Sequence, residues 1–210
     1  MSRAAAIKHG YTTGARGLAS RSVTSLTRTR ITPNALTASG VLLCGIASLL
    51  VLFENRNEIV FYWLAAVVFV VGSLLDILDG ALARAGGKTT PFGAFIDSTT
   101  DRVSEGFMLT AIAYTLAVHH HPVFVAVAMA AVAGSFLVSY TRARAEALGL
   151  RGDVGIGSRA ERVVVITAGL VLAPWGVLPW AIALLSCTAW LTVAQRVLHV
   201  RKQLMEANTE

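Results

Sequence analysis

Four long uncharged segments constrain the fold of this chain more than any other feature of its sequence. They are mostly apolar and cover residues 31–53, 59–75, 106–141 and 163–195. A membrane-spanning helix needs about 20 such residues, so the first two segments each predict one crossing and the last two each predict a pair. A His-His-His-Pro run at 119–122 divides the third segment, and a stretch with two prolines, 174–180, divides the fourth. The sequence therefore predicts an all-α, polytopic membrane protein with six transmembrane helices. They are expected near residues 34–53, 59–85, 92–118, 123–147, 160–173 and 178–199.

Composition agrees with this fold class. Of the 210 residues 55% are hydrophobic and 14% are charged, whereas soluble domains carry about 25% charged residues. The net charge of +6 follows the predicted loops rather than a folded basic module, so we expect membrane phosphates and no nucleic acid as its anionic partners. Cys44 and Cys187 lie in apolar segments without CxxC spacing and predict neither a disulfide nor a catalytic thiol.

The distribution of arginine and lysine predicts the orientation of the helices. Alternate connections are rich in these residues, while the opposite side has Arg56 beside two acids. The positive-inside rule then places both termini in the cytoplasm, at the cell membrane. Residues 1–30 are basic without any acid and predict an amphipathic interfacial arm, with a disordered tail as the alternative. We expect a six-helix membrane domain at 31–203 and a C-terminal tail at 204–210.

Four aspartates interrupt the apolar pattern at the predicted cytoplasmic ends of helices two and three. Asp76 and Asp79 are spaced i, i+3, and Asp97 and Asp101 are spaced i, i+4, so each pair shares one helix face. A short, turn-rich loop between the helices makes them antiparallel and brings the pairs together. Carboxylate oxygens are the ligands that Mg²⁺ and Mn²⁺ prefer. The spacing therefore predicts a four-carboxylate site for one or two such ions.

Small residues and one arginine accompany these acids. Gly80 and Ala83 continue the face of the first pair, and their small size would let a nucleotide or pyrophosphate reach the backbone. Gly93 lies one turn before the second pair. Arg84 could meet a phosphate oxygen, although an arginine that extends to the membrane surface would look the same in the sequence. We expect Glu105 to pair with a buried base, either Arg102 or one from helix four or five.

Together these residues form the pattern DxxDGxxARx8GxxxDxxxD, which resembles the signature of the CDP-alcohol phosphotransferase family of membrane enzymes. The resemblance implies transfer of a phosphatidyl group from CDP-diacylglycerol to an alcohol, with release of CMP. It implies that Asp76, Asp79 and Asp97 ligate metal and that Asp101 ligates metal or lies beside it and acts as general base. A Pro-Asn-x-x-Thr element near the nucleotide in that family makes Asn34 and Thr37 candidate contacts. The alternative for this element is an ordinary helix start.

A second cluster suggests a phosphorylated acceptor. Its members are Arg142, Arg144, Arg159 and Arg162. Arginine suits bidentate phosphate recognition, although a cytoplasmic loop also explains some of these residues. The surrounding sequence resembles phosphatidylinositol phosphate synthases, which implies that the four arginines bind the phosphate of inositol phosphate and that the protein is a homodimer. Two departures leave the acceptor open: Arg142 stands where a lysine is common, and Ser158 where an acid is common.

Three alternatives remain at this point. The acceptor could be glycerol 3-phosphate, giving phosphatidylglycerophosphate, or an unphosphorylated alcohol, which the arginines disfavour. Acids at membrane depth also occur in cation-coupled transporters. A transporter is expected to have charges near the midplane and two related halves, whereas here the charges gather at one end and no internal repeat is found.

Overall fold

The computed structural model describes residues 32–85, 87 and 89–207, and within these residues all regular structure is helical. The predicted interfacial arm at 1–30 lies outside the described residues. Six α-helices agree with the six that the sequence predicts, and the all-α fold class is confirmed. They are α2 (Pro33–Val51), α3 (Glu58–Ala85), α4 (Pro91–Val118), α5 (Pro122–Ala147), α6 (Arg159–Val171) and α7 (Leu178–Ala207), with short 3-10 turns η1 (Glu54–Arg56) and η2 (Ala173–Trp175).

The helix starts follow the expected capping chemistry. The Thr90 hydroxyl accepts a hydrogen bond from the Gly93 amide at 3.0 Å, with Pro91 in the first turn of α4. Ser158 and Glu161 form a reciprocal capping box at the start of α6, which satisfies two amide groups that an uncapped helix would leave unpaired. These caps fix where α4 and α6 begin. Asp97 and Asp101 follow in the second and third turns of α4, and Arg159 and Arg162 lie at the start of α6.

The end of α7 differs from the prediction. The helix continues to Ala207, whereas the last apolar segment predicts an end near residue 199. Arg201, Lys202 and Gln203 are good helix formers and extend the helix beyond its apolar part. The first residues of the predicted C-terminal tail are therefore helical.

Four of the six helices are long and apolar enough to cross a membrane. These candidate spans are Asn34–Val51, Glu58–Arg84, Pro122–Ala147 and Leu178–Glu206. The other two helices are α4, which carries acids in its N-terminal half, and α6, which has only 13 residues. The chain is thus a polytopic membrane protein, and the crossing of the membrane by α4 and α6 stays a prediction.

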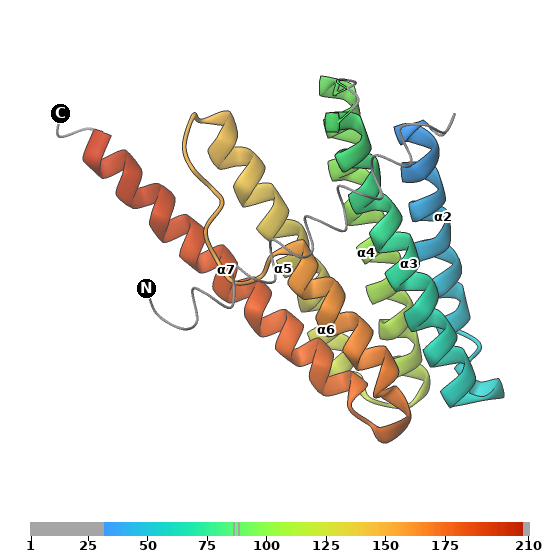
Figure 1. Ribbon diagram of the computed structural model, residues 1–210. Coiled ribbons are helices and arrows are strands. Elements are labelled where there is room, and N and C mark those ends of the chain that lie inside the picture. Colours follow the sequence, from blue (N-terminus) through green and yellow to red (C-terminus); the bar gives the residue numbers. More distant parts are fainter. Residues whose placement is uncertain (1–31, 86, 88, 208–210) are drawn as a thin grey trace, which may run out of the picture.

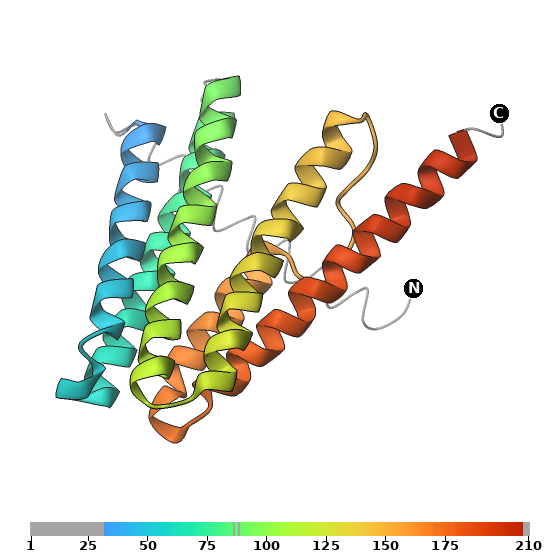
Figure 2. The same cartoon turned by 180° about the vertical axis from the view of Figure 1, so that it is seen from behind.

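The helices form two groups that converge toward the lower end of the bundle in Figure 1 and diverge toward its upper end. Figures 1 and 2 show α2, α3 and α4 on one side and α5 and α7 on the other, with α6 joining α3 to α7. The core between them is built from large apolar side chains such as Phe69, Met108, Ile112, Ile166 and Ile182. The packing brings the N-terminus of α6 against α3 and α4.

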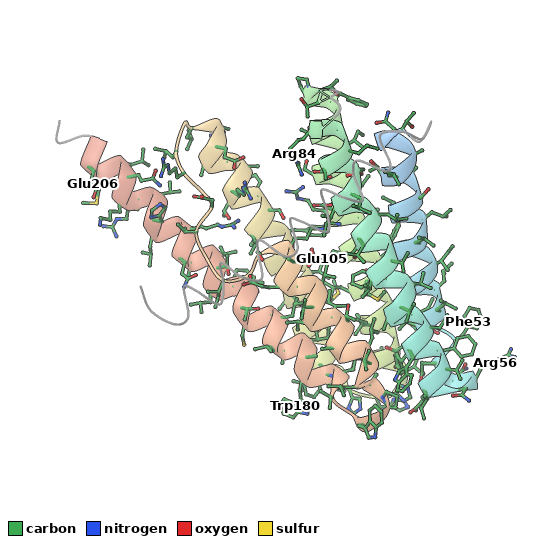
Figure 3. The ribbon with its side chains drawn as sticks, in the orientation of Figure 1. Phe53, Arg56, Arg84, Glu105, Trp180 and Glu206 are labelled. Carbon is green, nitrogen blue, oxygen red and sulfur yellow. The ribbon has the colours of Figure 1, made fainter. Side chains whose placement is uncertain are left out.

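The connections alternate between two ends of the bundle, as the sequence predicts. The α3–α4 and α5–α6 connections lie at the upper end in Figure 1, and the α4–α5 and α6–α7 turns lie at the lower end. Figure 3 shows Arg84 toward the upper end and Arg56 at the lower end. The arginine-rich connections therefore gather at one end of the molecule.

Backbone contact between α2 and α3 is very close. A Cβ atom added at Gly72 would lie 2.9 Å from the Gly40 carbonyl oxygen and 2.9 Å from the Cys44 Sγ. A Cβ added at Gly40 would meet the Gly72 carbonyl oxygen at the same distance. Such close approach needs small residues at the crossing point. The crossing lies one turn from Asp76 and so determines how α2 faces the acid-bearing end of α3.

Candidate functional site

Three of the four predicted aspartates converge. Asp76 of α3 and Asp97 and Asp101 of α4 each offer a carboxylate oxygen, and these oxygens lie within 4.8 Å of one another. Asp76 is buried and the other two are partly buried. Two unit charges at such a distance repel by roughly 3 kcal/mol at an effective dielectric constant of 20. The cluster therefore needs a compensating cation.

Asp79, the fourth aspartate, does not belong to this group. It lies one turn from Asp76 on the same helix and is buried, and its Oδ2 accepts a hydrogen bond from the Thr37 hydroxyl of α2. Its Oδ1 is buried and has no hydrogen-bond partner among the described residues. A buried carboxylate oxygen without a donor is costly, so this atom is an available ligand. The role of Asp79 as a metal ligand stays a prediction.

Thr37 was expected from the sequence only as a nucleotide contact. In the structure it orients Asp79 by donating to its carboxylate. No spacing rule links residues on α2 and α3, so the sequence gives no signal for this pair. Thr37 is thus tied to the acid-bearing helix, whereas the neighbouring candidate Asn34 is exposed.

Arg159 supplies a cation to the cluster. Its Nη1 donates to the Asp76 Oδ2 and lies 2.5 Å from the Asp101 Oδ1. Arg159 is the first residue of α6, directly after the Ser158 cap. The structure thus places one of the predicted phosphate-binding arginines in direct contact with two of the acids.

Arg162 has a different environment from Arg159. It is buried, and its Nε and Nη2 donate to the two Glu105 oxygens at 2.6 and 2.9 Å. Its Nη1 donates to the Gly157 carbonyl at 2.8 Å. The prediction that Glu105 pairs with a buried base is confirmed, and of the alternatives, Arg102 or a base from helix four or five, the base belongs to the fifth helix. Figure 3 shows Glu105 near the middle of the bundle. This geometry favours a structural role for Arg162, and phosphate binding by it stays a prediction.

The remaining two arginines of the predicted cluster lie near the end of α5. Both are exposed, and Arg142 donates from its Nε to Glu146 at 2.8 Å, one turn along the same helix. Arg144 lies in the last turn of α5. Arg142 and Arg162 both interact electrostatically with Arg196 of α7. Arg196 is thus a third arginine on which the charges of both residues act, and the functional prediction did not include it.

The loop between α5 and α6 is held by α7. Gly157 donates its amide to the Thr192 Oγ1 at 2.8 Å, and Arg196 donates its Nε to the Val154 carbonyl at 2.8 Å and its Nη1 to the Val138 carbonyl. Arg196 is an ionisable residue inside an apolar helix, which is a functional signal by default. From the sequence, Arg196 is only one of the basic residues that predict the orientation of the helices. Its contacts help to fix the start of α6 beside the acids.

Two small residues of the signature have local partners. A Cβ added at Gly80 would lie 3.3 Å from the Arg84 Nη1, so the arginine folds back over this glycine. A Cβ added at Gly93 would meet the Thr90 Oγ1 at 3.1 Å, within the α4 cap. Ala83 is partly buried on the same helix as Gly80. The nucleotide-binding roles of these four residues stay predictions.

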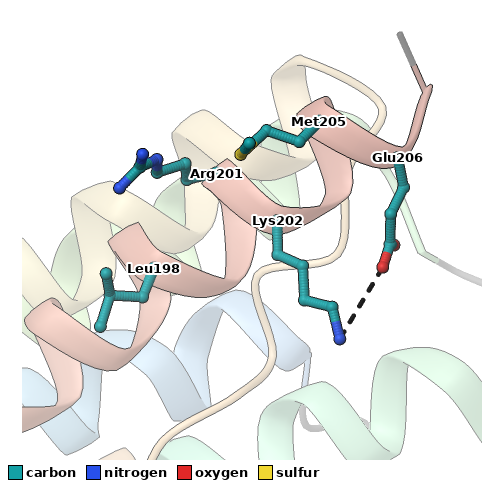
Figure 4. Close-up of a pocket in the computed structure, with 5 residues that line it drawn as sticks. All are labelled: Leu198, Arg201, Lys202, Met205 and Glu206. Atoms are coloured by element: carbon teal, nitrogen blue, oxygen red, sulfur yellow. Dashed lines mark ion pairs between the residues drawn. The ribbon is translucent and has the colours of Figure 1, made fainter. Parts of the chain in front are cut away.

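A small cavity lies directly beside the acids. The cavity lies between α3, α4 and α6 and has a volume of about 10 Å³. This volume holds about one water molecule. Its polar wall consists of Ser73, Asp101, Ser104, Glu105 and Arg159. A larger hollow of about 410 Å³ lies elsewhere, on the C-terminal turns of α7 (Figure 4). All the residues that line it belong to this one helix, including the Lys202–Glu206 pair at 3.7 Å, so it is a surface hollow remote from the acids.

The acid cluster fits a divalent cation. Three carboxylates have converging oxygens, and the Asp79 Oδ1, which has no hydrogen-bond partner in the described part of the chain, lies one turn away. These are the oxygen ligands that Mg²⁺ or Mn²⁺ takes. When bound, such an ion supplies concentrated positive charge beside a phosphate group. The arrangement suits chemistry on a phosphate or pyrophosphate at the end of the bundle.

Comparison with known proteins gives a consistent result. Residues 30–200 match the family model described as CDP-alcohol phosphatidyltransferase. The chain is 38% identical over 175 residues to the archaetidylinositol phosphate synthase of Pyrococcus horikoshii, which covers 83% of this chain and 86% of that protein.

Two crystal structures of the phosphatidylinositol phosphate synthase of Mycobacterium tuberculosis have the same fold. The one with bound CDP-DAG aligns with a TM-score of 0.76 and 30% identity, covering 87% of this chain and 92% of that one. The one in complex with manganese and citrate aligns with a TM-score of 0.77 and 31% identity, covering 87% and 88%. On the strength of the family model and these relatives, the chain belongs to the CDP-alcohol phosphatidyltransferase family.

Proposed function

We propose that this protein transfers a phosphatidyl group from CDP-diacylglycerol to a hydroxyl of inositol 1-phosphate, forming phosphatidylinositol phosphate and CMP. The proposal is supported by the family, by the names of the relatives and by the CDP-DAG in one of the similar structures. The observation that carries it is the convergence of Asp76, Asp97 and Asp101 with Arg159 at one end of the bundle. This places candidate ligands for a cation next to a candidate ligand for a phosphate.

The chemistry follows from the charges of the site. The acceptor hydroxyl oxygen forms a bond to the phosphorus that carries the diacylglycerol, and the bond from this phosphorus to the CMP oxygen breaks. Asp101 takes the proton from the attacking hydroxyl as general base. Asp76, Asp79 and Asp97 would hold one or two Mg²⁺ or Mn²⁺ ions, which would supply positive charge beside the pyrophosphate and the departing CMP.

Substrate binding is divided between the two helix groups. CDP-diacylglycerol contacts Asn34 and Thr37 on α2, the Gly80, Ala83 and Arg84 segment of α3, and Gly93 on α4. The acceptor phosphate is held by the arginine cluster, with Arg142 and Arg144 on α5 and with Arg159 and Arg162 on α6. The exposed side chains of Arg142 and Arg144 are accessible to a soluble acceptor.

In this proposal the site lies on the cytoplasmic side of the cell membrane. Asp76, Asp97 and Asp101 lie in the parts of α3 and α4 that adjoin the α3–α4 connection, and the positive-inside rule assigns the end with the arginine-rich connections to the cytoplasm. Soluble inositol phosphate and the CMP product then exchange directly with the cytoplasm. We propose that the protein works as a homodimer, as the resemblance to phosphatidylinositol phosphate synthases implies.

An acceptor panel tests the reaction. Purified protein in detergent is incubated with labelled CDP-diacylglycerol, Mg²⁺ and one acceptor at a time: inositol 1-phosphate, glycerol 3-phosphate, inositol or serine. CMP release and a labelled phosphatidylinositol phosphate are expected with inositol 1-phosphate. Product with glycerol 3-phosphate alone would assign a phosphatidylglycerophosphate synthase. Because detergent provides no membrane gradient, Mg²⁺-dependent CMP release also excludes a cation-coupled transporter.

A further inference from the structure

Arg159 and a divalent cation compete for the same atoms. The guanidinium Nη1 lies between Asp76 and Asp101 and contacts one oxygen of each, and these two residues belong to the three-carboxylate cluster. A metal ion bound by all three carboxylates would bring two positive charges to the place where Nη1 now lies. The guanidinium and the metal ion repel each other. A metal ion can therefore occupy the three-carboxylate cluster fully only when the Arg159 guanidinium moves away from it.

The backbone of Arg159 is fixed while its side chain is long enough to move. The Ser158–Glu161 capping box holds the first turn of α6, and the Arg162 pair with Glu105 holds the second. The Arg159 side chain is 27% exposed, whereas that of Asp76 is 3% exposed. The guanidinium therefore has an open direction in which to turn without unfolding α6, and the carboxylate does not.

We propose that Arg159 is an exchangeable counter-cation of the acid cluster: it offsets part of the negative charge of the carboxylates before metal binds, and metal binding releases it to the acceptor phosphate. This inference rests on the proposed function for the identity of the acceptor. Metal and acceptor binding are then coupled. The metal displaces Arg159 from the carboxylates, and the acceptor phosphate binds the displaced Arg159 and keeps it away from them. By thermodynamic reciprocity, the acceptor strengthens metal binding by the same factor as the metal strengthens acceptor binding.

The first test measures metal binding without turnover. Mn²⁺ affinity is determined by electron paramagnetic resonance for the substrate-free protein, the Arg159→Gln variant and the Arg159→Lys variant. We expect Arg159→Gln to bind Mn²⁺ about 5- to 150-fold more tightly, in the usual range of coupling between sites, and Arg159→Lys to remain close to the unmodified protein. Unchanged or weaker Mn²⁺ binding by Arg159→Gln would overturn the proposal.

A matched control separates competition from general electrostatics. Arg201→Gln removes the same charge from an exposed position on α7 and should leave Mn²⁺ affinity nearly unchanged. An equal gain in both variants would mean that only net charge matters, which also overturns the proposal. Thermal unfolding without metal checks folding: Arg159→Gln is expected to be less stable than the unmodified protein, and Mn²⁺ should restore its melting temperature.

The second test addresses the acceptor. Mn²⁺ titrations are repeated with saturating inositol 1-phosphate and corrected by a protein-free titration for complexes in solution. The acceptor should raise Mn²⁺ affinity of the unmodified protein and leave that of Arg159→Gln unchanged. An equal response of both proteins would overturn the transfer of Arg159 to the acceptor phosphate. Neither test needs catalysis, so a protein that passes both but forms no lipid product contradicts the proposed function and not this inference.

Discussion

Glu105 of α4 and Arg162 of α6 form a buried ion pair in which two guanidinium nitrogens donate to the two carboxylate oxygens. The third nitrogen donates to the Gly157 carbonyl of the preceding loop. The pair thus joins α4, which carries two of the acids, to the helix that begins with Arg159. Its geometry controls how closely Arg159 approaches the carboxylates.

Removing one partner of this pair should destabilise the protein strongly. Glu105→Gln leaves the Arg162 charge buried without a counter-charge, and breaking such a pair costs about 3–5 kcal/mol. The double variant Glu105→Leu with Arg162→Met removes both charges and should be more stable than Glu105→Gln. Thermal and denaturant unfolding in detergent measure both effects.

The exposed Lys202–Glu206 pair on α7 is the matched control. Its nitrogen–oxygen distance is 3.7 Å and both side chains are largely exposed, so Glu206→Gln should change stability by less than about 1 kcal/mol. A similar loss for Glu105→Gln and Glu206→Gln would contradict the structural role of the buried pair.

The close contact of α2 and α3 predicts a sharp difference between two glycines. Gly72→Ala places a methyl group 2.9 Å from the Gly40 carbonyl and from the Cys44 sulfur, so the helices must separate at a cost of about 1–3 kcal/mol. A Cβ at Gly45 meets nothing within 4 Å, and Gly45→Ala should be neutral or stabilise α2 by about 0.5–1 kcal/mol. Unfolding measured for both variants checks this; equal behaviour would show that the two helices are not in backbone contact.

The helices could be predicted because the signals for them are local. The uncharged segments, and breaks such as the prolines at 174 and 179, identify six helices, and their observed starts lie at or within one residue of the predicted ones. The spacing of Asp97 and Asp101 likewise predicts a shared face, which the structure confirms by placing both with Asp76. In each case the deciding residues lie within a few turns of one another.

The contacts between distant helices could not be predicted in the same way. Thr37 and Asp79 are separated by 42 positions and Arg159 and Asp76 by 83, and their meeting depends on how α2, α3 and α6 cross. The sequence predicts a second cluster of arginines but no direct contact between Arg159 and the aspartates, because charge patterns do not give the depth at which a helix begins. The loop before α6 returns along α5 and α7, which brings Arg159 to the level of the carboxylates.

Thr37 should act through Asp79. Thr37→Val keeps the shape of the side chain but leaves the Asp79 Oδ2 without its donor, which costs about 1–3 kcal/mol for a buried acceptor. We expect a lower melting temperature and altered Mn²⁺ affinity, both restored in Thr37→Ser because serine keeps the hydroxyl. If Thr37→Ser were as impaired as Thr37→Val, the methyl group and not the hydrogen bond would be the important part.

Asp101 should be essential for catalysis and dispensable for lipid binding. Asp101→Asn removes the base that takes the proton from the acceptor hydroxyl, and the loss of a general base lowers turnover by about 100- to 10,000-fold. CMP release should fall by this factor while binding of CDP-diacylglycerol, measured with the labelled lipid, is largely retained. Retained turnover in Asp101→Asn would remove the assignment of Asp101 as base.

The loop before α6 should control the acceptor more than the lipid substrate. Gly155 has a φ of +112°, and a Cβ added there would lie 2.4 Å from the Thr192 Cγ2. Gly155→Ala thus combines backbone strain with a clash against α7 and should shift the start of α6, which carries Arg159. We expect the KM for inositol 1-phosphate to rise several-fold, by about tenfold if the acceptor loses 1.4 kcal/mol of binding free energy, with little change in the KM for CDP-diacylglycerol.

Gly149 in the same loop provides the control for this prediction. Its φ is also positive, +74°, but a Cβ added there meets nothing within 4 Å. Gly149→Ala therefore carries only the strain of a left-handed residue, about 1–2 kcal/mol, and should lower stability without changing the KM for the acceptor. If both alanine variants raised this KM equally, loop strain alone would be responsible and the contact between Gly155 and Thr192 would have no part in positioning Arg159.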